Sequence, residues 1–291
     1  MAGHSASPAK RDFRFAPTSL RTPLETIMSF EPTILGRTGL EVGRLGLGVD
    51  YGIPPDAVEE AFQRGVNYFY WGAFRMKGMG RAIRRLAKNN REKMVVTVQN
   101  YWPSEGLIPQ GIKRVLRQLK LDYADVLLFS TFRRRPNQRA IDTALKLKEK
   151  GLIHHLGLAC HHRPRYAEVE KEKIFDVFHV RYNAVHRGAE KDVFPLLPEE
   201  NGPGIVIYTA TCWTKLLRQN YIPKNEKVPK ATDCYRFVLS HPSVHVCLCA
   251  PKNLEQTRED LQTLEMGPMT EEELAWMRRV GDYIYHKGKG V

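Results

Sequence analysis

Residues 124–129 read ADVLLF and residues 153–159 read IHHLGLA, two short apolar runs that each suit a strand buried on both faces. Between them Ile141 and Leu145 recur at helical spacing, and Gly151 marks the end of that helix. The segment therefore predicts a strand, a helix and a second strand that runs parallel to the first.

The same alternation of strand and helix repeats along most of the chain. Helical segments such as residues 108–119, whose apolar residues fall on one face, separate the apolar runs. Eight such units within about 220 residues predict a (β/α)8 barrel, the TIM-barrel fold of the α/β class. An open doubly wound sheet would need a glycine-rich turn after its first strand, which residues 50–54 lack. The predicted strands are Leu45–Val49, Asn67–Trp71, Met94–Gln99, Ala124–Phe129, Ile153–Ala159, Phe175–Val180, Gly204–Tyr208 and Val244–Cys249.

Three further segments complete the predicted organisation. A glycine-containing turn within residues 33–42 predicts an N-terminal β-hairpin, and the apolar stripe of Glu271–Ile284 predicts a C-terminal helix. Residues 1–32 carry no sustained apolar period, so we expect a flexible arm, in which Met28 is an alternative start. One barrel domain is expected over residues 33–291.

The chain is strongly basic, with 45 lysines and arginines against 32 acidic residues in 291, a formal charge of +13. Basic residues gather over 75–91 and at Arg133–Arg135 near the predicted barrel mouth, which favours a small anionic ligand over nucleic acid. No run approaches the ~18 apolar residues of a membrane-spanning helix. Five cysteines without a CxxC pair indicate a reducing compartment, so we expect a cytoplasmic protein; its oligomeric state is left open.

In a barrel of this kind the active site is built at the carboxyl ends of the strands. The sequence places polar and aromatic side chains at the end of every predicted strand. They are Asp50, Tyr51, Tyr70, Trp71, Arg75, Gln99, Tyr101, Trp102, Ser130, Thr131, Cys160, His161, His162, His179, Tyr182, Asn183, Tyr208, Thr209, Pro251, Lys252 and Asn253.

Several short segments, in their order and spacing, resemble the aldo-keto reductase family. They are LGRTGLEV at 35–42, LGLG at 45–48, GVNYF at 65–69, LDYAD at 121–125, GLI and LG within 151–157, and Tyr182-Asn183. The resemblance extends over residues 33–264 and so covers the whole predicted barrel. It implies the same fold that the alternation of elements predicts.

The resemblance implies reduction of aldehydes or ketones with NADPH, through a tetrad of Asp, Tyr, Lys and His at the ends of strands two to four. In such a tetrad the lysine ammonium lowers the pKa of the phenol from near 10, and the phenol protonates the carbonyl oxygen as hydride arrives. Here the four positions hold Tyr70, Arg75, Gln99 and Ser130. The resemblance therefore implies a rebuilt active site.

Two interpretations of the substituted positions stay open. Tyr70 beside Arg75 is a phenol next to a cation, which is the same electrostatic device as the family's and would make Tyr70 a relocated acid. Alternatively, Tyr70 and Trp71 are aromatic side chains that fill the space left by the tetrad.

The histidines near the mouth allow other chemistry. His161 is a candidate general base or substrate contact, and a lyase or hydrolase that uses the mouth histidines without nicotinamide is a third hypothesis. Cys160, His161 and His179 are of metal-ligating types, but no spacing motif joins them, so no metal site is predicted.

The resemblance also places a cofactor. An aromatic residue after strand seven stacks on the nicotinamide ring in the family, and Tyr208 matches it. The segment after the last strand resembles the one that holds the adenosine and its 2′-phosphate, where the amides at a helix start can add to a phosphate site. The predicted NADP(H)-binding residues are His179, Asn183, Tyr208, Lys252, Asn253, Gln256, Glu259 and Asp260.

Two functions from different classes follow for the chain. The first is an NADP(H)-linked oxidoreductase of aldo-keto reductase type, with an undetermined carbonyl or alcohol substrate and with Tyr70, Arg75, Gln99, Ser130 and His161 at its rebuilt site. The second is a catalytically inactive barrel of the same type that binds a ligand or regulates another protein. The substituted tetrad favours the second, whereas Tyr208 and the segment 252–260 favour the first.

Overall fold

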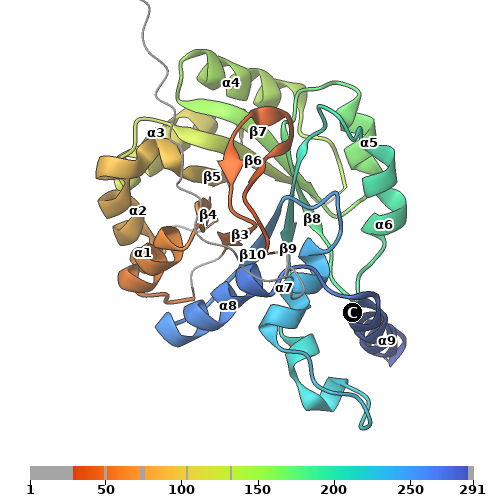
Figure 1. The fold of residues 1–291 in the computed structure, drawn as a ribbon. Coiled ribbons are helices and arrows are strands. Elements are labelled where there is room, and N and C mark those ends of the chain that lie inside the picture. The colour runs from red at the N-terminus through yellow and green to blue at the C-terminus, as the bar shows by residue number, and fades with distance from the viewer. Residues whose placement is uncertain (1–28, 49–50, 73–75, 103, 132, 288–291) are drawn as a thin grey trace, which may run out of the picture.

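A computed structural model of the protein describes residues 29–48, 51–72, 76–102, 104–131 and 133–287. Its centre is a closed barrel of eight parallel strands in the order β10-β3-β4-β5-β6-β7-β8-β9, surrounded by helices (Figure 1). This confirms the predicted (β/α)8 barrel. The strands are β3 (Leu45–Leu47), β4 (Tyr68–Trp71), β5 (Val95–Asn100), β6 (Ala124–Thr131), β7 (Ile153–Cys160), β8 (Val177–Arg181), β9 (Gly204–Tyr208) and β10 (Val246–Cys249).

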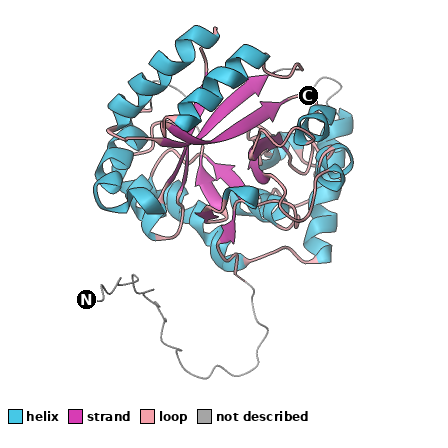
Figure 2. Cartoon of the chain, turned by 90° about the horizontal axis from the view of Figure 1, so that it is seen from above, coloured by secondary structure: helices cyan, strands magenta, loops and turns pink. Residues whose placement is uncertain are grey.

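The helices alternate with the strands and form the outer layer (Figure 2). They are α1 (Pro55–Gln63), α2 (Lys77–Asn90), α3 (Ile108–Leu119), α4 (Gln138–Glu149), α5 (Pro164–Glu170), α6 (Ala189–Asp192), α7 (Ala231–Leu239), α8 (Leu254–Met266) and α9 (Glu271–Lys287). Short 3₁₀ helices cover Gly36–Thr38, Arg91–Lys93, Glu105–Leu107, Phe194–Leu196, Lys215–Leu217 and Gln219–Tyr221. None of the described helices is long and apolar enough to cross a lipid bilayer.

The predicted N-terminal hairpin is present as β1 (Thr33–Ile34) paired antiparallel with β2 (Glu41–Val42). Leu35 and Val42 are fully buried and pack with the inward side chains of the barrel strands, so the hairpin closes one end of the barrel. The packed part of the chain begins before the predicted boundary, because Phe30 is buried and its N–H donates to the carbonyl of Leu264. Residues 1–28 of the predicted arm lie outside the described residues.

Strand register decides which side chains enter the barrel. Tyr68, Val177 and Val206 belong to an inner apolar cluster, whereas Phe69 and Phe178 belong to the cluster between the strands and the helices. Because side chains alternate along a strand, the residues two positions further on also face inward at the carboxyl ends. The inner face of the barrel therefore supplies the floor of any site at that end.

Candidate active site

A cavity of about 800 Å³ opens at the carboxyl ends of the strands, as the barrel prediction required. Ten of the predicted site residues line it: Tyr70, Gln99, Ser130, His161, His179, Tyr208, Lys252, Gln256, Glu259 and Asp260. Asn183 and Asn253 are not among its lining residues. Arg75 lies outside the described residues, so the pairing of Tyr70 with Arg75 stays a prediction.

The ends of β4 and β5 carry a neutral pair in the positions that the resemblance assigns to the tetrad. The Tyr70 hydroxyl donates a hydrogen bond of 3.0 Å to Oε1 of Gln99. Burial raises the pKa of Tyr70 well above its ordinary value, and the neighbouring hydroxyl of Tyr101 adds to the increase. An activated phenol would need a shift in the opposite direction. Trp71 does not fill the cavity, because it is buried in the outer cluster and its ring lies against Gly80 of α2.

A chain of buried hydrogen bonds crosses the barrel interior below this pair. The Thr97 hydroxyl donates to the Tyr68 hydroxyl at 2.7 Å, and the Tyr68 hydroxyl lies 2.8 Å from Nε2 of His179. Because Tyr68 accepts from Thr97, its own proton is directed to Nε2, which leaves the ring proton of His179 on Nδ1. Burial lowers the pKa of His179 to about 3, so the imidazole is neutral. A neutral ring with an Nδ1–H donor therefore lines the cavity floor.

The end of β7 separates two residues that the metal alternative would bring together. Cys160 is buried in the outer cluster, and its N–H donates to the Tyr166 hydroxyl at 2.8 Å. His161 instead lines the cavity, where burial and the charge of Arg181 lower its pKa. Among the described residues no three His, Cys, Asp or Glu side chains group in a way that could hold a metal ion.

Arg181, which the sequence analysis passed over, is a cation at the cavity edge. It is the last residue of β8, on the same face as the inward Val177 and His179, and it stands in register with Tyr208. Its Cζ lies 5.9 Å from the centre of the Trp213 ring. The signal was present in the sequence, because positions 177, 179 and 181 share one face of a strand.

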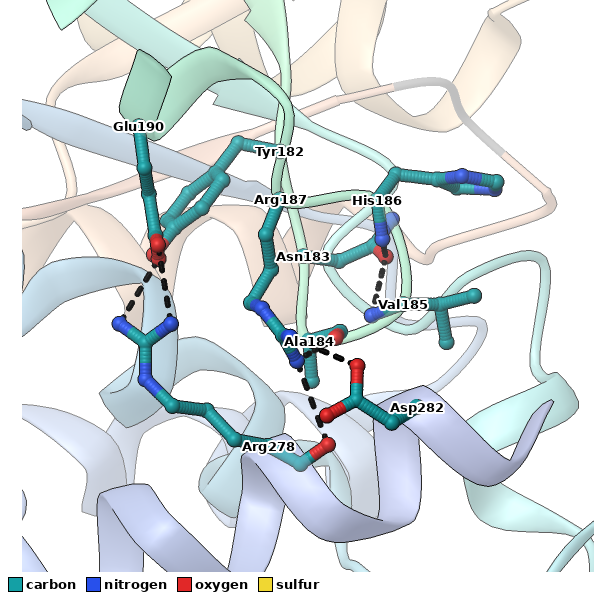
Figure 3. Close-up of polar contacts among 9 residues, drawn as sticks. All are labelled: Tyr182, Asn183, Ala184, Val185, His186, Arg187, Glu190, Arg278 and Asp282. Carbon is teal, nitrogen blue, oxygen red and sulfur yellow. Dashed lines mark hydrogen bonds and ion pairs between the residues drawn. The ribbon is translucent and has the colours of Figure 1, made fainter. Parts of the chain in front are cut away.

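The loop after β8 is held by Asn183, the predicted cofactor residue that does not reach the cavity. Its Oδ1 accepts the N–H groups of Val185 and His186 at 3.0 and 2.8 Å (Figure 3). Its Nδ2 donates to the carbonyl of Thr209 at 2.8 Å. Asn183 thus ties the loop after β8 to the loop after β9 through three hydrogen bonds of its side-chain amide.

Helix α9 buttresses the same loop from outside (Figure 3). Arg278 donates two hydrogen bonds of 2.8 and 2.9 Å to Glu190, which also accepts the Tyr182 hydroxyl at 2.6 Å. Arg187 donates to Asp282 at 2.6 Å and to the carbonyl of Arg278 at 3.2 Å. The predicted C-terminal helix therefore positions the loop that follows β8.

The loop after β9 is strained. Thr209, Cys212, Trp213 and Thr214 all have φ between 50° and 66°, the left-handed region that residues other than glycine seldom adopt. Each such residue costs on the order of 1 kcal/mol or more, and such strain is found where a binding site needs a fixed loop. Because the loop lines the cavity, the strain is located at the site.

The start of α8 contributes the opposite wall. Asn253 is the N-cap residue, and its side chain accepts the N–H of Gln256 at 2.9 Å. The Gln256 side chain in turn accepts the N–H of Lys252 at 2.9 Å. Lys252 is exposed and, within the described part of the chain, makes no ion pair. Asn253 therefore shapes the helix start, whereas Lys252 offers a free charge beside the cavity.

Asp260 is a buried carboxyl group in the wall of the cavity. It is 5% exposed and lies 3.5 Å from the Tyr235 hydroxyl. Burial, with the neighbouring charge of Glu259, raises the pKa of Asp260 to about 7. The Asp260 carboxyl group is therefore close to half protonated at neutral pH.

The basic residues that give the chain its charge lie mostly on the helix layer. Lys77, Arg81, Arg85 and Lys88 are exposed on α2, where Arg85 donates to Glu59 at 3.0 Å. Arg135 pairs with Glu172 at 2.5 Å, and none of the three residues Arg133–Arg135 is among the cavity lining. The charge nearest to the cavity comes instead from Arg181, Lys252 and other residues of its rim.

Known proteins resemble the chain in sequence and in structure. The model of the Aldo/keto reductase family matches residues 55–227. The "uncharacterized oxidoreductase YqkF" of Bacillus subtilis (strain 168) is 23% identical over 290 residues, which cover 82% of this chain and 93% of that protein.

Two solved structures share the fold. The aldo-keto reductase AKR11C1 from Bacillus halodurans, in its holo form, has a TM-score of 0.72 at 20% identity, over 86% of this chain and 96% of its own. An aldo-keto reductase from Klebsiella pneumoniae in complex with NADPH has a TM-score of 0.71 at 18% identity, over 86% and 95%. The family model spans more than half of the 291 residues, within the segment that the short motifs had marked. The chain belongs to the aldo/keto reductase family.

Proposed function

We propose that the chain is an NADP(H)-linked oxidoreductase that acts on a small carbonyl or alcohol substrate through a rebuilt active site. The observation that carries the proposal is Tyr208, an aromatic ring at the end of β9 that faces a cavity of about 800 Å³ running from His179 to Lys252. Family membership and the NADPH complex of the Klebsiella pneumoniae neighbour support it.

The residues present fit a dinucleotide cofactor. Tyr208 offers a ring face for the nicotinamide, and the Nδ1–H of His179 offers a donor for its carboxamide oxygen. Lys252, beside the start of α8, offers a charge for the 2′-phosphate, and a partly protonated Asp260 reduces the repulsion of an anion at that wall. The cofactor, when bound, supplies hydride transfer.

In this proposal His161 is the residue that exchanges a proton with the substrate. Its lowered pKa leaves the imidazole uncharged at neutral pH, and its side chain lines the cavity. An uncharged imidazole accepts a proton from an alcohol and returns it to a carbonyl oxygen. Tyr70, whose raised pKa keeps it protonated, orients the substrate by hydrogen bonding together with Gln99.

One observation favours the second candidate, a barrel that binds the ligand without turnover. The described ends of β4, β5 and β6 place Tyr70, Gln99 and Ser130 in the cavity, all three neutral. Such a set binds and orients polar groups but holds no side chain that exchanges a proton readily near neutral pH.

Calorimetric titration with NADPH tests the proposal. Wild-type protein is expected to bind with a dissociation constant in the range of typical KM values, about 1 µM to 1 mM, and an absence of binding at ~1 mM NADPH contradicts the proposal. Tyr208→Ala is expected to weaken binding ~10- to 100-fold through lost stacking. The matched control is Tyr285→Ala, which removes an exposed ring on α9.

Turnover separates the two candidates. NADPH consumption with a panel of aldehydes and ketones, and NADP⁺ reduction with the matching alcohols, is expected for wild-type protein and is expected to fall ~10²- to 10⁴-fold in His161→Gln. NADPH binding with no turnover across the whole panel selects the ligand-binding barrel instead.

A further inference from the structure

A group of cationic side chains lies between the ends of β8 and β9, beside the cavity. Arg181 ends β8, and Lys215 begins the 3₁₀ helix Lys215–Leu217 that follows the strained loop. The ring of Trp213 lies near both Arg181 and His186. Its centre is 5.9 Å from Cζ of Arg181 and 5.9 Å from the centre of the His186 ring. The positive charges of Arg181 and Lys215 both act on His186. We call Arg181, His186, Trp213 and Lys215 the β8–β9 cluster.

The positive charge of the cluster is not neutralised within the chain. Across the described ranges, no carboxylate lies within 4.0 Å of the charged groups of Arg181 or Lys215. The third cation that acts on His186 is Arg163, which pairs with Asp192 at 2.8 Å. Two cations therefore remain beside the cavity without a counter-charge.

His186 supplies a buried polar group that lacks a partner. The residue is 8% exposed, and its Nε2 is buried without a hydrogen bond to any described residue. Asn183 accepts its N–H at 2.8 Å, and Figure 3 shows its ring directed away from the contacts with α9. A buried ring nitrogen without a partner in a native structure indicates a group that completes it.

The strained backbone fixes the cluster in place. Cys212, Trp213 and Thr214 have φ of 50°, 52° and 66°, so the three residues that precede Lys215 are held in an unfavourable backbone conformation. Trp213 is 53% exposed and lines the cavity, which places the cluster at the cavity rim and open to solvent. A small ligand that enters the cavity can therefore reach the cluster.

We infer that the β8–β9 cluster is a binding subsite for a phosphoryl group, with Arg181 and Lys215 as its charged donors and Nε2–H of His186 as its neutral donor. The forked guanidinium, the ammonium and the imidazole together offer more donors than the two oxygens of a carboxylate can accept, whereas a phosphoryl group presents three oxygens. The inference does not depend on the proposed redox function, which enters only in deciding which molecule carries the phosphoryl group.

Inorganic phosphate is the probe for the full chain. Isothermal titration at constant ionic strength is expected to show phosphate binding at least ~10-fold tighter than acetate binding. The imidazole nitrogen resonances of His186 are expected to shift on phosphate addition, which locates the ion. Arg181→Gln is expected to weaken phosphate binding ~10- to 100-fold, and Arg181→Lys, which keeps the charge, less than that. Lys215→Gln provides a second variant, at the half-buried first residue of the 3₁₀ helix Lys215–Leu217.

Matched controls decide the result. Arg117→Gln removes the same charge from an exposed position on α3 and is expected to leave phosphate affinity unchanged. The inference is overturned if wild-type protein does not bind phosphate, if acetate binds equally well, or if Arg181→Gln and Lys215→Gln bind phosphate like Arg117→Gln.

A final titration identifies the source of the phosphoryl group. If NADPH displaces phosphate, the subsite takes a phosphate of the cofactor; if phosphate also binds to NADPH-loaded protein, the subsite takes a phosphorylated substrate. A chain that binds phosphate but not NADPH would contradict the proposed function and leave the subsite supported.

Discussion

The two halves of the cavity differ in charge and in strain. At the ends of β4 to β6 the described side chains that line the cavity are neutral; they are Tyr70, which is bonded to Gln99, and Ser130. At the ends of β8 to β10 the chain places Arg181, Lys252 and a strained loop. The difference indicates that the charged groups available for ligand binding are concentrated in the second half.

A buried connection joins the two halves. Tyr68 of β4 and Thr97 of β5 reach across the barrel to His179 of β8 through hydrogen bonds of 2.8 and 2.7 Å. The neutral half therefore contributes to the second half by fixing the tautomer of a cavity-lining ring. Variants in each half, taken from the largest expected effect to the smallest, test whether this division holds.

Asp260→Asn tests the buried carboxyl of the charged half. With a folded pKa of about 7 and an unfolded value of 3.8, the folded state keeps its proton while the unfolded state loses it, so wild-type stability falls as the pH rises from about 4 to 7. Asparagine does not ionise, so the variant does not lose stability in this way as the pH rises. As the pH rises from 5 to 8, we expect the free energy of unfolding of the variant to increase by about 2–3 kcal/mol relative to that of wild type, measured by urea unfolding.

The control for Asp260 lies on the same helix. Glu255→Gln removes an exposed carboxylate from α8 and is expected to show the same pH dependence as wild type. Equal pH dependence in wild type and Asp260→Asn would mean that Asp260 ionises normally in the fold.

Tyr68→Phe tests the connection between the halves. The variant leaves the Thr97 hydroxyl and Nε2 of His179 buried without their partner, which costs about 2–3 kcal/mol of unfolding free energy. Urea unfolding at pH 7 measures it. Val95→Ala truncates a similarly buried inward side chain without touching a hydrogen bond. If Tyr68→Phe proves neutral, the buried chain does not hold His179.

Arg278→Ala tests the support of the loop after β8. It removes two hydrogen bonds to Glu190 and is expected to lower the free energy of unfolding by about 1–2 kcal/mol. The adjacent Arg279→Ala removes one exposed bond to Glu226 and is expected to change it by less than ~0.5 kcal/mol. Equal effects of the two variants in thermal unfolding would contradict a special role of the Arg278 pair.

Tyr70→Phe tests the neutral half and has the smallest expected effect. We expect NADPH affinity to change less than ~2-fold and turnover less than ~10-fold, since a lost general acid typically costs ~10²–10⁴-fold. Titration and steady-state kinetics measure both. A loss in that larger range would restore Tyr70 as the acid and remove His161 from that role.

The fold was predictable because local patterns decide it. The apolar face of residues 108–119 and the run 204–208 gave the observed bounds of α3 and β9, and the strand–helix alternation gave the barrel. The sequence predicted the ends of some strands less accurately, because these ends depend on tertiary contacts. β8 begins at Val177 rather than Phe175, and β10 begins at Val246 rather than Val244.

The location of the candidate site could be predicted from the sequence, but the hydrogen-bond partners and neighbours of its side chains could not. The expectation that the site lies at the carboxyl ends of the strands identified most of the residues that line the cavity. It cannot show that the side-chain amide of Asn183 makes three hydrogen bonds within the chain. Arg181 and His186 were missed because an apolar run ends before them, and only the register of β8 with β9 shows that Arg181 stands beside Tyr208. Which residues bind a ligand stays a prediction for the variants above.

The bracing of the loop after β8 by α9 also sets an order of events during synthesis. Glu190 and Arg278 are 88 residues apart in the chain. At roughly 5–20 residues per second, the ribosome needs about 5–20 s to make the residues between them. During that interval the last two barrel strands, β9 and β10, are made, while the loop after β8 still lacks its contacts with α9. The nascent barrel therefore completes its wall before its binding site, and the final helix is the step that makes the site rigid.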